Sequence, residues 1–265
     1  MSDRFSSRWI RRALRRSTRS TSGAQSSGEE RGKFPLVALN EAIRLDLNAI
    51  YVAIPKTGST AIRQQFSHRG PFLLPAPHLT IRQLETLWHF WNMRESLHRN
   101  LQFPTNPKIV MSDLEVLEAS EARFQSTVRF ATVRNPFART LSLWRRREGI
   151  QVQHEMTFHE FCDQLAYASD TCMWPTRNQC QVDWLTGWGD STLQVPNVLR
   201  LENLAKDLEA FAKEFPQMSF LRNNEANVNH RSGIGRNYAE AYSVSARQAV
   251  ELVFRRDLET FNYEF

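Results

Sequence analysis

Short apolar segments alternate with stretches of helical periodicity from about residue 34 onward. The continuously apolar segment 49–54 predicts a first buried strand, and a helix is expected over about 59–67. The longest periodic segment, 79–99, predicts a second helix, because large apolar residues recur at three- and four-residue intervals. These residues are Leu84, Leu87, Trp88, Trp91 and Leu97.

The second half of the chain repeats this alternation. Residues 126–133 are rich in β-branched side chains and predict a strong strand. Asn135 and Pro136 then form a favourable helix start, with Asn as N-cap and Pro in the first turn, leading through Trp144. The remaining predicted elements are a short strand at 108–111, a strand at 197–201, a helix from Asn203 to Phe215 stopped by Pro216, and a last helix at about 245–260.

Strands that alternate with helices over crossover-length connections indicate a parallel sheet covered by helices. A chain of 265 residues has room for one large domain or two small ones. No internal repeat is visible in the sequence, and no apolar run approaches the roughly 20 residues of a membrane-spanning helix. We therefore expect a single α/β domain over 34–265.

Charge is distributed unevenly and sets the first 33 residues apart as a basic tail. The net charge is +6, and residues 1–33 carry nine Lys and Arg against three Asp and Glu, which leaves the rest of the chain neutral. Residues 4–16 have the spacing of an amphipathic helix that could lie on an anionic membrane surface, although they equally fit a transit peptide or a disordered extension. Residues 17–33 are typical of a flexible linker. The neutral body argues against nucleic-acid binding by bulk charge.

Three cysteines without paired spacing argue against a disulfide framework or a structural zinc site. Their pattern favours a reducing compartment, and we expect a cytoplasmic protein whose tail is a candidate for membrane-surface contact.

The segment Ile54–Thr60 carries the clearest chemical signal. It follows the first predicted strand and reads Ile-Pro-Lys-Thr-Gly-Ser-Thr, ahead of a predicted helix. Gly58 permits close backbone approach, the helix N-terminus offers amide groups to an anion, and Lys56 adds a cation. The segment departs from the nucleotide-triphosphate loop, which needs an earlier glycine and places Lys after the last one. It predicts a phosphate site of another kind.

A second cation follows the second strong strand. Arg134 stands at the predicted strand end, and its planar fork suits bidentate contact with a phosphate. Ser142 lies about two helical turns further on, three residues after Arg139. Spacing alone leaves open whether Ser142 and Arg134 reach one phosphate, and whether Arg139 contacts a ligand or forms a structural ion pair.

Together the two motifs resemble the sulfotransferases that use 3′-phosphoadenosine 5′-phosphosulfate (PAPS), and most closely the branch with carbohydrate sulfotransferases and bacterial relatives. Residues 55–60 look like that family's 5′-phosphosulfate loop, and residues 133–142 look like its 3′-phosphate motif. The resemblance continues more weakly through 198–203, 229–232 and 261–265. It implies a P-loop-kinase-like parallel sheet flanked by helices, and no bound metal.

The resemblance also implies roles for individual residues. Lys56 would stabilise charge on the bridging oxygen as the sulfuryl group leaves, and Arg134 and Ser142 would bind the 3′-phosphate. Arg231 and Ser232, in a basic glycine-containing turn, are candidates to close over that phosphate. The backbone amides of the loop and two of its hydroxyls would hold the 5′-phosphate, which makes the remaining donor-binding residues Thr57, Gly58, Ser59 and Thr60. The product would be 3′,5′-adenosine bisphosphate.

The acceptor hydroxyl needs a base, and His78 is the candidate because it resembles a histidine to which the family assigns that role. A purely structural histidine, hydrogen-bonded near Thr80, is the alternative, and Glu85 is a carboxylate substitute more typical of a solvated helix surface. The resemblance favours a carbohydrate acceptor. Trp174, Trp184 and Trp188 could stack on sugar rings, although Trp is more often buried.

Two other functional classes fit parts of the sequence. A nucleotide or polynucleotide kinase would share the strand–loop–helix phosphate site, but should show a Walker-type glycine pattern and a metal-holding acid. A non-catalytic anion- or membrane-surface-binding protein would explain the tail and the loops without a base.

Overall fold

The computed structural model describes residues 39–67, 72–102, 112–145, 156–168, 179–189, 192–221 and 238–265. The basic tail, the predicted strand at 108–111, Trp174, and Arg231 with Ser232 lie outside these ranges. None of the described helices is both long and apolar enough to cross a bilayer.

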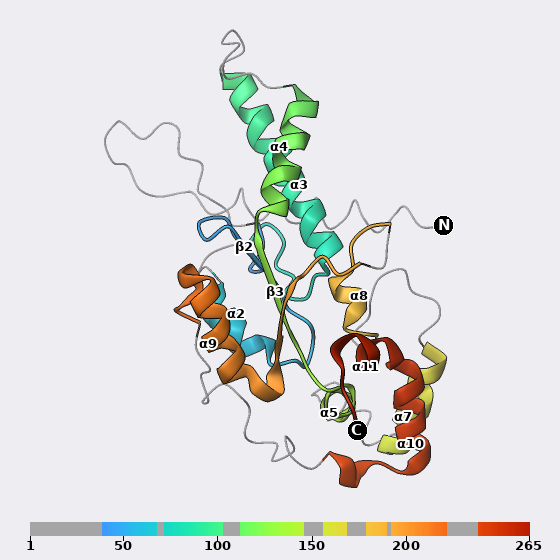
Figure 1. Cartoon of the computed structure of the whole chain (residues 1–265). Helices are drawn as coiled ribbons and strands as arrows, with labels where there is room; N and C mark the ends of the chain where they lie inside the picture. Colours follow the sequence, from blue (N-terminus) through green and yellow to red (C-terminus); the bar gives the residue numbers. More distant parts are fainter. Residues whose placement is uncertain are drawn as a thin grey trace, which may run out of the picture.

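The described residues form a mostly parallel four-stranded sheet in the order β1-β2-β3-β4 (Figure 1). β2 (Ala49–Val52), β3 (Val128–Val133) and β4 (Asn197–Arg200) run parallel, as the alternation predicts. β1 (Ile43–Arg44) pairs antiparallel with β2 through a tight connection and was not predicted. The α/β class predicted from the sequence is confirmed, but the sheet is not wholly parallel, because β1 adds an antiparallel edge strand.

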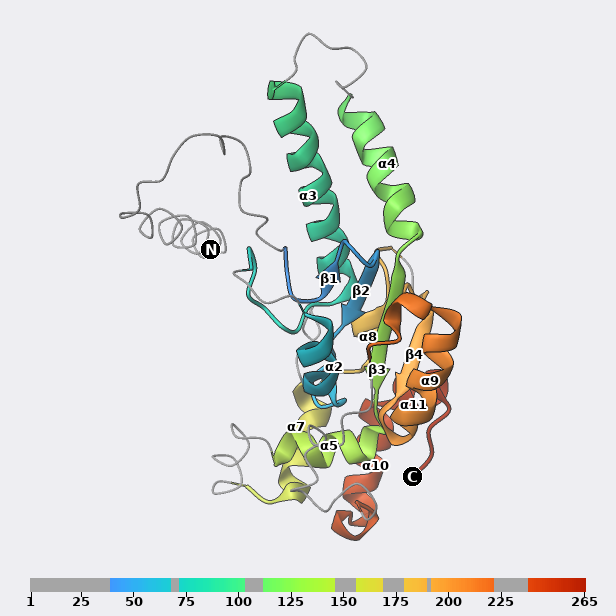
Figure 2. The same cartoon turned by 90° about the vertical axis from the view of Figure 1, so that its left-hand side faces the viewer.

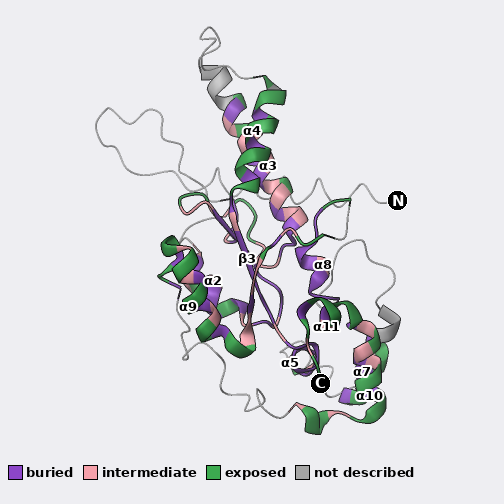
Figure 3. Ribbon diagram, viewed as in Figure 1, coloured by how far each residue is buried: buried purple, intermediate pink, exposed green. Residues whose placement is uncertain are grey.

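Helices cover both faces of the sheet because β2 and β3 are apolar on both sides, as central parallel strands usually are. One face packs on α2 (Ser59–Phe66) and α9 (Leu204–Glu214). The other packs on α3 (Ile81–Gln102), α8 (Val182–Leu185) and α11 (Arg255–Phe261). Figure 3 shows β3 buried between these layers, with the exposed residues on the outer sides of the helices.

A third apolar cluster joins α5 (Pro136–Trp144), α7 (Phe158–Ala168) and α10 (Val244–Val253) beyond the carboxyl end of β3. The predicted helix at 245–260 is in fact two helices, because the chain turns at Phe254. Phe254 is fully buried in this third cluster, whereas Phe261 packs in the core under the sheet. The two helices thus contribute to different apolar clusters.

α3 and α4 (Asp113–Gln125) form a hairpin that extends beyond the amino end of β3, on the opposite side from α5 (Figures 1 and 2). α4 was missed, although Ser112 and Glu115 form a capping box that marks its start in the sequence. Trp88 and Phe124 pack edge to face across the base of the hairpin. The first turn of α3 lies near α8, because Arg82 hydrogen-bonds Thr186 just after that helix.

Candidate functional site

The loop after β2 is held in an unusual backbone conformation. Lys56 and Gly58 both have positive φ angles, 68° and 79°. Gly58 is the N-cap of α2 and, having no side chain, makes no capping hydrogen bond to that helix terminus. The first N–H groups of an α-helix have no intrahelical partner and carry partial positive charge. The N-terminus of α2 therefore presents its amides to an anion, with the half-buried Lys56 in the same loop.

A buried chain of hydroxyl groups fixes this loop to the sheet. The Thr57 hydroxyl donates to the carbonyl oxygen of Ile54 at 2.9 Å and lies 3.0 Å from the Thr132 hydroxyl. The Tyr51 hydroxyl also lies 2.8 Å from the Thr132 hydroxyl. Thr57 is fully buried and both contacts of its hydroxyl are internal, so its side chain is structural.

Arg134 stands beside this loop because β2 and β3 are parallel neighbours whose carboxyl ends meet at one edge of the sheet. Its Nη1 atom donates to the carbonyl oxygen of Lys56 at 3.4 Å. Burial lowers the pKa of the Arg134 guanidinium, and the nearby Glu202 carboxylate opposes that shift. A guanidinium remains charged in proteins, so the structure brings two cations, Lys56 and Arg134, to the same strand ends.

The helix after β3 starts as its sequence predicts. The Asn135 side chain accepts a hydrogen bond from the amide of Phe137 at 3.0 Å and caps α5. The amide of Asn135 donates to Glu202 at 2.7 Å, which fixes the turn from its other side. Asn135 caps α5 with its side chain, whereas the N-cap of α2 is a glycine and cannot do so. The two motifs therefore differ in their source of positive charge, which is the amides at the start of α2 and the Arg134 guanidinium before α5.

Arg139 is structural. It is fully buried on α5, and it donates from Nε to the carbonyl oxygen of Pro55 at 3.1 Å and from Nη1 to that of Gln179 at 3.0 Å. The ambiguity in its role is thereby resolved, because a side chain with no exposed surface that bonds two carbonyl groups ties the loop to the rest of the fold. Ser142 lies one turn further along α5 and is half-buried. Its contact with a 3′-phosphate stays a prediction.

His78 lies just before α3 and points to the end of β2. Its Nδ1 atom is 2.6 Å from the carbonyl oxygen of Ala53, and its ring meets Trp184 edge-on at 6.5 Å. The partner is Ala53 and not a group near Thr80, which instead bonds Gln83. A carbonyl oxygen only accepts, so Nδ1 carries the proton of this contact, and a neutral ring would then have its lone pair on Nε2.

Three polar residues of the site were not predicted: the fully buried Gln181 and Asp257, and the exposed Glu202. Glu202 accepts from the amide of Asn135 and from the Tyr263 hydroxyl. Gln181 hydrogen-bonds the backbone of Arg134, and Asp257 accepts from Gln181. Each is far from its partners in the sequence, so no local spacing signals the contact.

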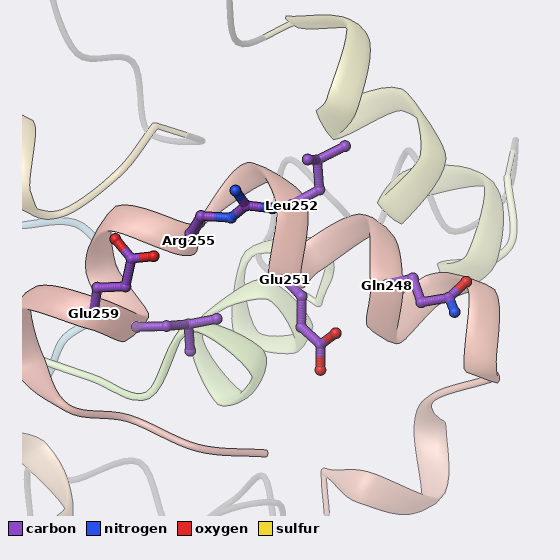
Figure 4. Close-up of a pocket in the computed structure, with 6 residues that line it drawn as sticks. Gln248, Glu251, Leu252, Arg255 and Glu259 are labelled. Atoms are coloured by element: carbon purple, nitrogen blue, oxygen red, sulfur yellow. The ribbon is translucent and has the colours of Figure 1, made fainter.

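Other clusters of the described residues do not include the phosphate motifs. On the α3–α4 hairpin, ligand atoms of Glu85, His89 and Glu121 all lie within 4.8 Å of one another. Glu85 is half-buried and not the solvated residue expected, and burial, with Glu121 nearby, raises the pKa of its carboxyl group. Figure 4 shows a hollow on α10 and α11, lined by Gln248, Glu251, Leu252, Arg255, Leu258 and Glu259.

Comparison with known proteins places the chain in a family. A model described as the sulfotransferase family matches residues 43–264, which include both strand-end motifs. Neither the search of curated proteins nor the search of solved structures finds a match. Because the family model spans most of the chain, the protein belongs to the sulfotransferase family.

Proposed function

We propose that this protein transfers a sulfuryl group from PAPS to a hydroxyl group of a carbohydrate acceptor. The family supports sulfuryl transfer in general. The single observation that carries the choice of donor is the 3.4 Å contact between Arg134 and the carbonyl group of Lys56. The two strand-end motifs are adjacent at this contact, which supports binding of a nucleotide phosphorylated at both its 5′ and 3′ positions.

The donor-binding roles divide between the two strand ends. The amides of Thr57 to Thr60, with the hydroxyls of Ser59 and Thr60, would hold the 5′-phosphate at the N-terminus of α2. Arg134 and Ser142 would bind the 3′-phosphate. Arg231 and Ser232 remain candidates for the same phosphate. The arrangement would be that of a P-loop-kinase-like sheet whose glycine and lysine occupy different positions in the loop.

Transfer would proceed by in-line attack of the acceptor oxygen on sulfur. The new O–S bond forms as the bond between sulfur and the bridging phosphate oxygen breaks, which releases 3′,5′-adenosine bisphosphate. Lys56 would stabilise the negative charge that develops on the bridging oxygen. A sulfuryl group carries less charge than a terminal phosphoryl group, so amides and a lysine suffice without a catalytic metal.

His78 is the proposed base. Its Nε2 atom would take the acceptor proton while Nδ1–H donates to Ala53, which holds the ring and fixes the tautomer. Trp184 packs against the imidazole and would limit water access on that side. Both contacts orient the ring before any acceptor arrives, and this preorganisation supports the assignment.

A sugar acceptor is supported by Trp188, which is 53% exposed in the loop after α8. Arg82, in the first turn of α3 just after His78, lies over the Trp188 ring at 5.8 Å and donates to the carbonyl group of Thr186 at 3.1 Å. These contacts hold an exposed aromatic face near the base. For the best acceptor in a glycan screen, Trp188→Ala should raise KM more than it lowers kcat. Phe90→Ala, which changes a similarly exposed ring on the hairpin, is the matched control.

A thermal-shift titration tests the donor. Stabilisation by 3′,5′-adenosine bisphosphate, unmatched by ATP with magnesium, is expected. An equal response to both would favour a kinase-like phosphotransferase, and no response to either would favour a non-catalytic role and contradict the proposal.

Labelled sulfate transfer tests the catalytic residues. Lys56→Ala and His78→Ala should each reduce kcat by about two orders of magnitude or more. Lys213→Ala and His159→Ala, at exposed positions on α9 and α7, are the matched controls and should leave the rate unchanged. Full activity of His78→Ala would remove the base assignment.

A further inference from the structure

The segment before α8 contacts the backbone of Arg134 through one buried side chain. The amide of Arg134 donates to Oε1 of Gln181 at 2.9 Å, and Nε2 of Gln181 donates to the carbonyl oxygen of Arg134 at 2.8 Å. Gln181 has no exposed surface. It therefore pairs with both polar backbone groups of Arg134, much as a neighbouring strand would, at the point where β3 ends.

A buried carboxylate on α11 fixes the orientation of that glutamine. Asp257 accepts from the amide of Gln181 at 2.8 Å, from Nε2 of Gln181 at 3.2 Å, and from the amide of Val182 at 2.9 Å. A carboxylate only accepts, so it can face the NH₂ end of the glutamine but not the oxygen. Asp257 thereby leaves Oε1 of Gln181 to receive the amide of Arg134.

The charge of Asp257 is balanced by the buried guanidinium of Arg139. Burial raises the pKa of the Asp257 carboxyl group, whereas the Arg139 guanidinium and the hydrogen bonds from Gln181 and Val182 lower it. Arg139 in turn bonds the carbonyl groups of Pro55 and Gln179. Residues 179–182 are thus linked to both motifs: Gln179 through Arg139 to the carbonyl group of Pro55, and Gln181 directly to the Arg134 backbone.

We propose that Gln181 and Asp257 are positioning residues that hold Arg134 in place for the 3′-phosphate of the donor. Neither side chain is exposed to a ligand, so Gln181 acts through the Arg134 backbone and Asp257 acts through Gln181. Bidentate recognition of a phosphate needs the guanidinium held within about 0.5 Å of its productive position. The hydrogen bonds of Gln181 fix the residue from which that side chain extends. This inference rests on the proposed function.

The test compares the affinities of 3′,5′-adenosine bisphosphate and 5′-AMP, which differ only in the 3′-phosphate. Their ratio, measured by calorimetric titration, reports the contribution of that phosphate. Gln181→Met keeps the volume and the Asp257–Arg139 charge pair but removes the contact with Arg134. It should reduce the ratio about tenfold or more, the effect of one lost hydrogen bond to a charged group, and leave the affinity for 5′-AMP nearly unchanged.

Two further variants separate positioning from general stability. Asp257→Asn should reduce the ratio in the same direction, but it leaves Arg139 without its buried counter-charge and could fail to fold, so Gln181→Met carries the test. Val250→Ala removes buried volume from the third apolar cluster but changes none of the hydrogen bonds of Arg134, Gln181 and Asp257 described above. It should lower the unfolding temperature and keep the affinity ratio of the wild type.

The outcomes distinguish this inference from the function on which it rests. A wild type that binds both nucleotides equally would contradict donor binding as proposed. A wild type that prefers the bisphosphate, together with a Gln181→Met variant that keeps the same ratio, would overturn the positioning role alone. A parallel loss of both affinities in Gln181→Met would also overturn it, because a merely structural residue would produce that pattern.

Discussion

The glycine at the N-terminus of α2 offers a direct test of how the phosphate loop is built. Gly58 has a φ of +79°, and a Cβ atom placed there would lie 2.5 Å from Cδ1 of Leu201, just after β4. Gly58→Ala therefore meets two obstacles. The left-handed backbone costs a residue with a side chain about 1–2 kcal/mol, and the methyl group overlaps a leucine that packs against the core.

The size of the effect follows from these two terms. Overpacking costs about 1–3 kcal/mol, and we take the lower end because the end of a leucine side chain can rotate. Alanine also lowers the conformational entropy of the unfolded chain, which stabilises the folded state by about 0.4–1 kcal/mol. We expect Gly58→Ala to lower the free energy of unfolding by about 2 kcal/mol, measured by urea denaturation followed by circular dichroism.

Gly189 provides a matched control for the backbone term. Its φ is +81°, yet a Cβ atom there would have no neighbour within 4 Å. Gly189→Ala should cost about 1 kcal/mol or less, since it carries the backbone strain without the overlap. Leu201→Ala removes the side chain that the new methyl group would overlap. The double variant Gly58→Ala/Leu201→Ala should therefore be about 1 kcal/mol more stable than the sum of the two single losses. Equal losses for the two glycine variants, or a coupling near zero with Leu201, would refute the reasoning.

Two further predictions follow from buried titratable groups. Burial raises the pKa of the Cys162 and Cys180 thiols to about 12, so neither should react with a disulfide reagent at pH 8 until the protein unfolds. The measurement uses a variant whose third cysteine is replaced by serine, and stoichiometric labelling of the native protein would contradict the prediction. Burial and the Glu121 carboxylate raise the pKa of Glu85, so its stabilising contribution is complete below the unfolded pKa and is lost as the pH rises through the folded value. Thermal unfolding should therefore show Glu85→Gln equal to the wild type near pH 4 but more stable at pH 7, and the same gain in the exposed control Glu118→Gln would count against this origin.

Local sequence signals predicted much of the fold because they act within a few residues. β2 is a continuously apolar run and β3 is rich in β-branched residues, and both are buried in the sheet as such patterns predict. The start of α5 follows from the Asn135–Pro136 pair, whose cap is formed within the helix itself. The break at Phe254 could not be predicted in the same way. It depends on two separate apolar clusters, one formed with α7 and the other with α8, which exist only in the folded chain.

The candidate site divides in the same manner. The sequence alone determined the two cationic strand ends, because Lys56, Gly58 and Arg134 are recognisable from their neighbours, and parallel strands bring their carboxyl ends together. Only the tertiary structure decided which polar groups hold those ends. Gln181 bonds Arg134 from 47 residues further along the chain, and Asp257 bonds Gln181 from 76 residues beyond that. Hydrogen bonds are short and directional, so partners so far apart in sequence are chosen by packing and not by spacing.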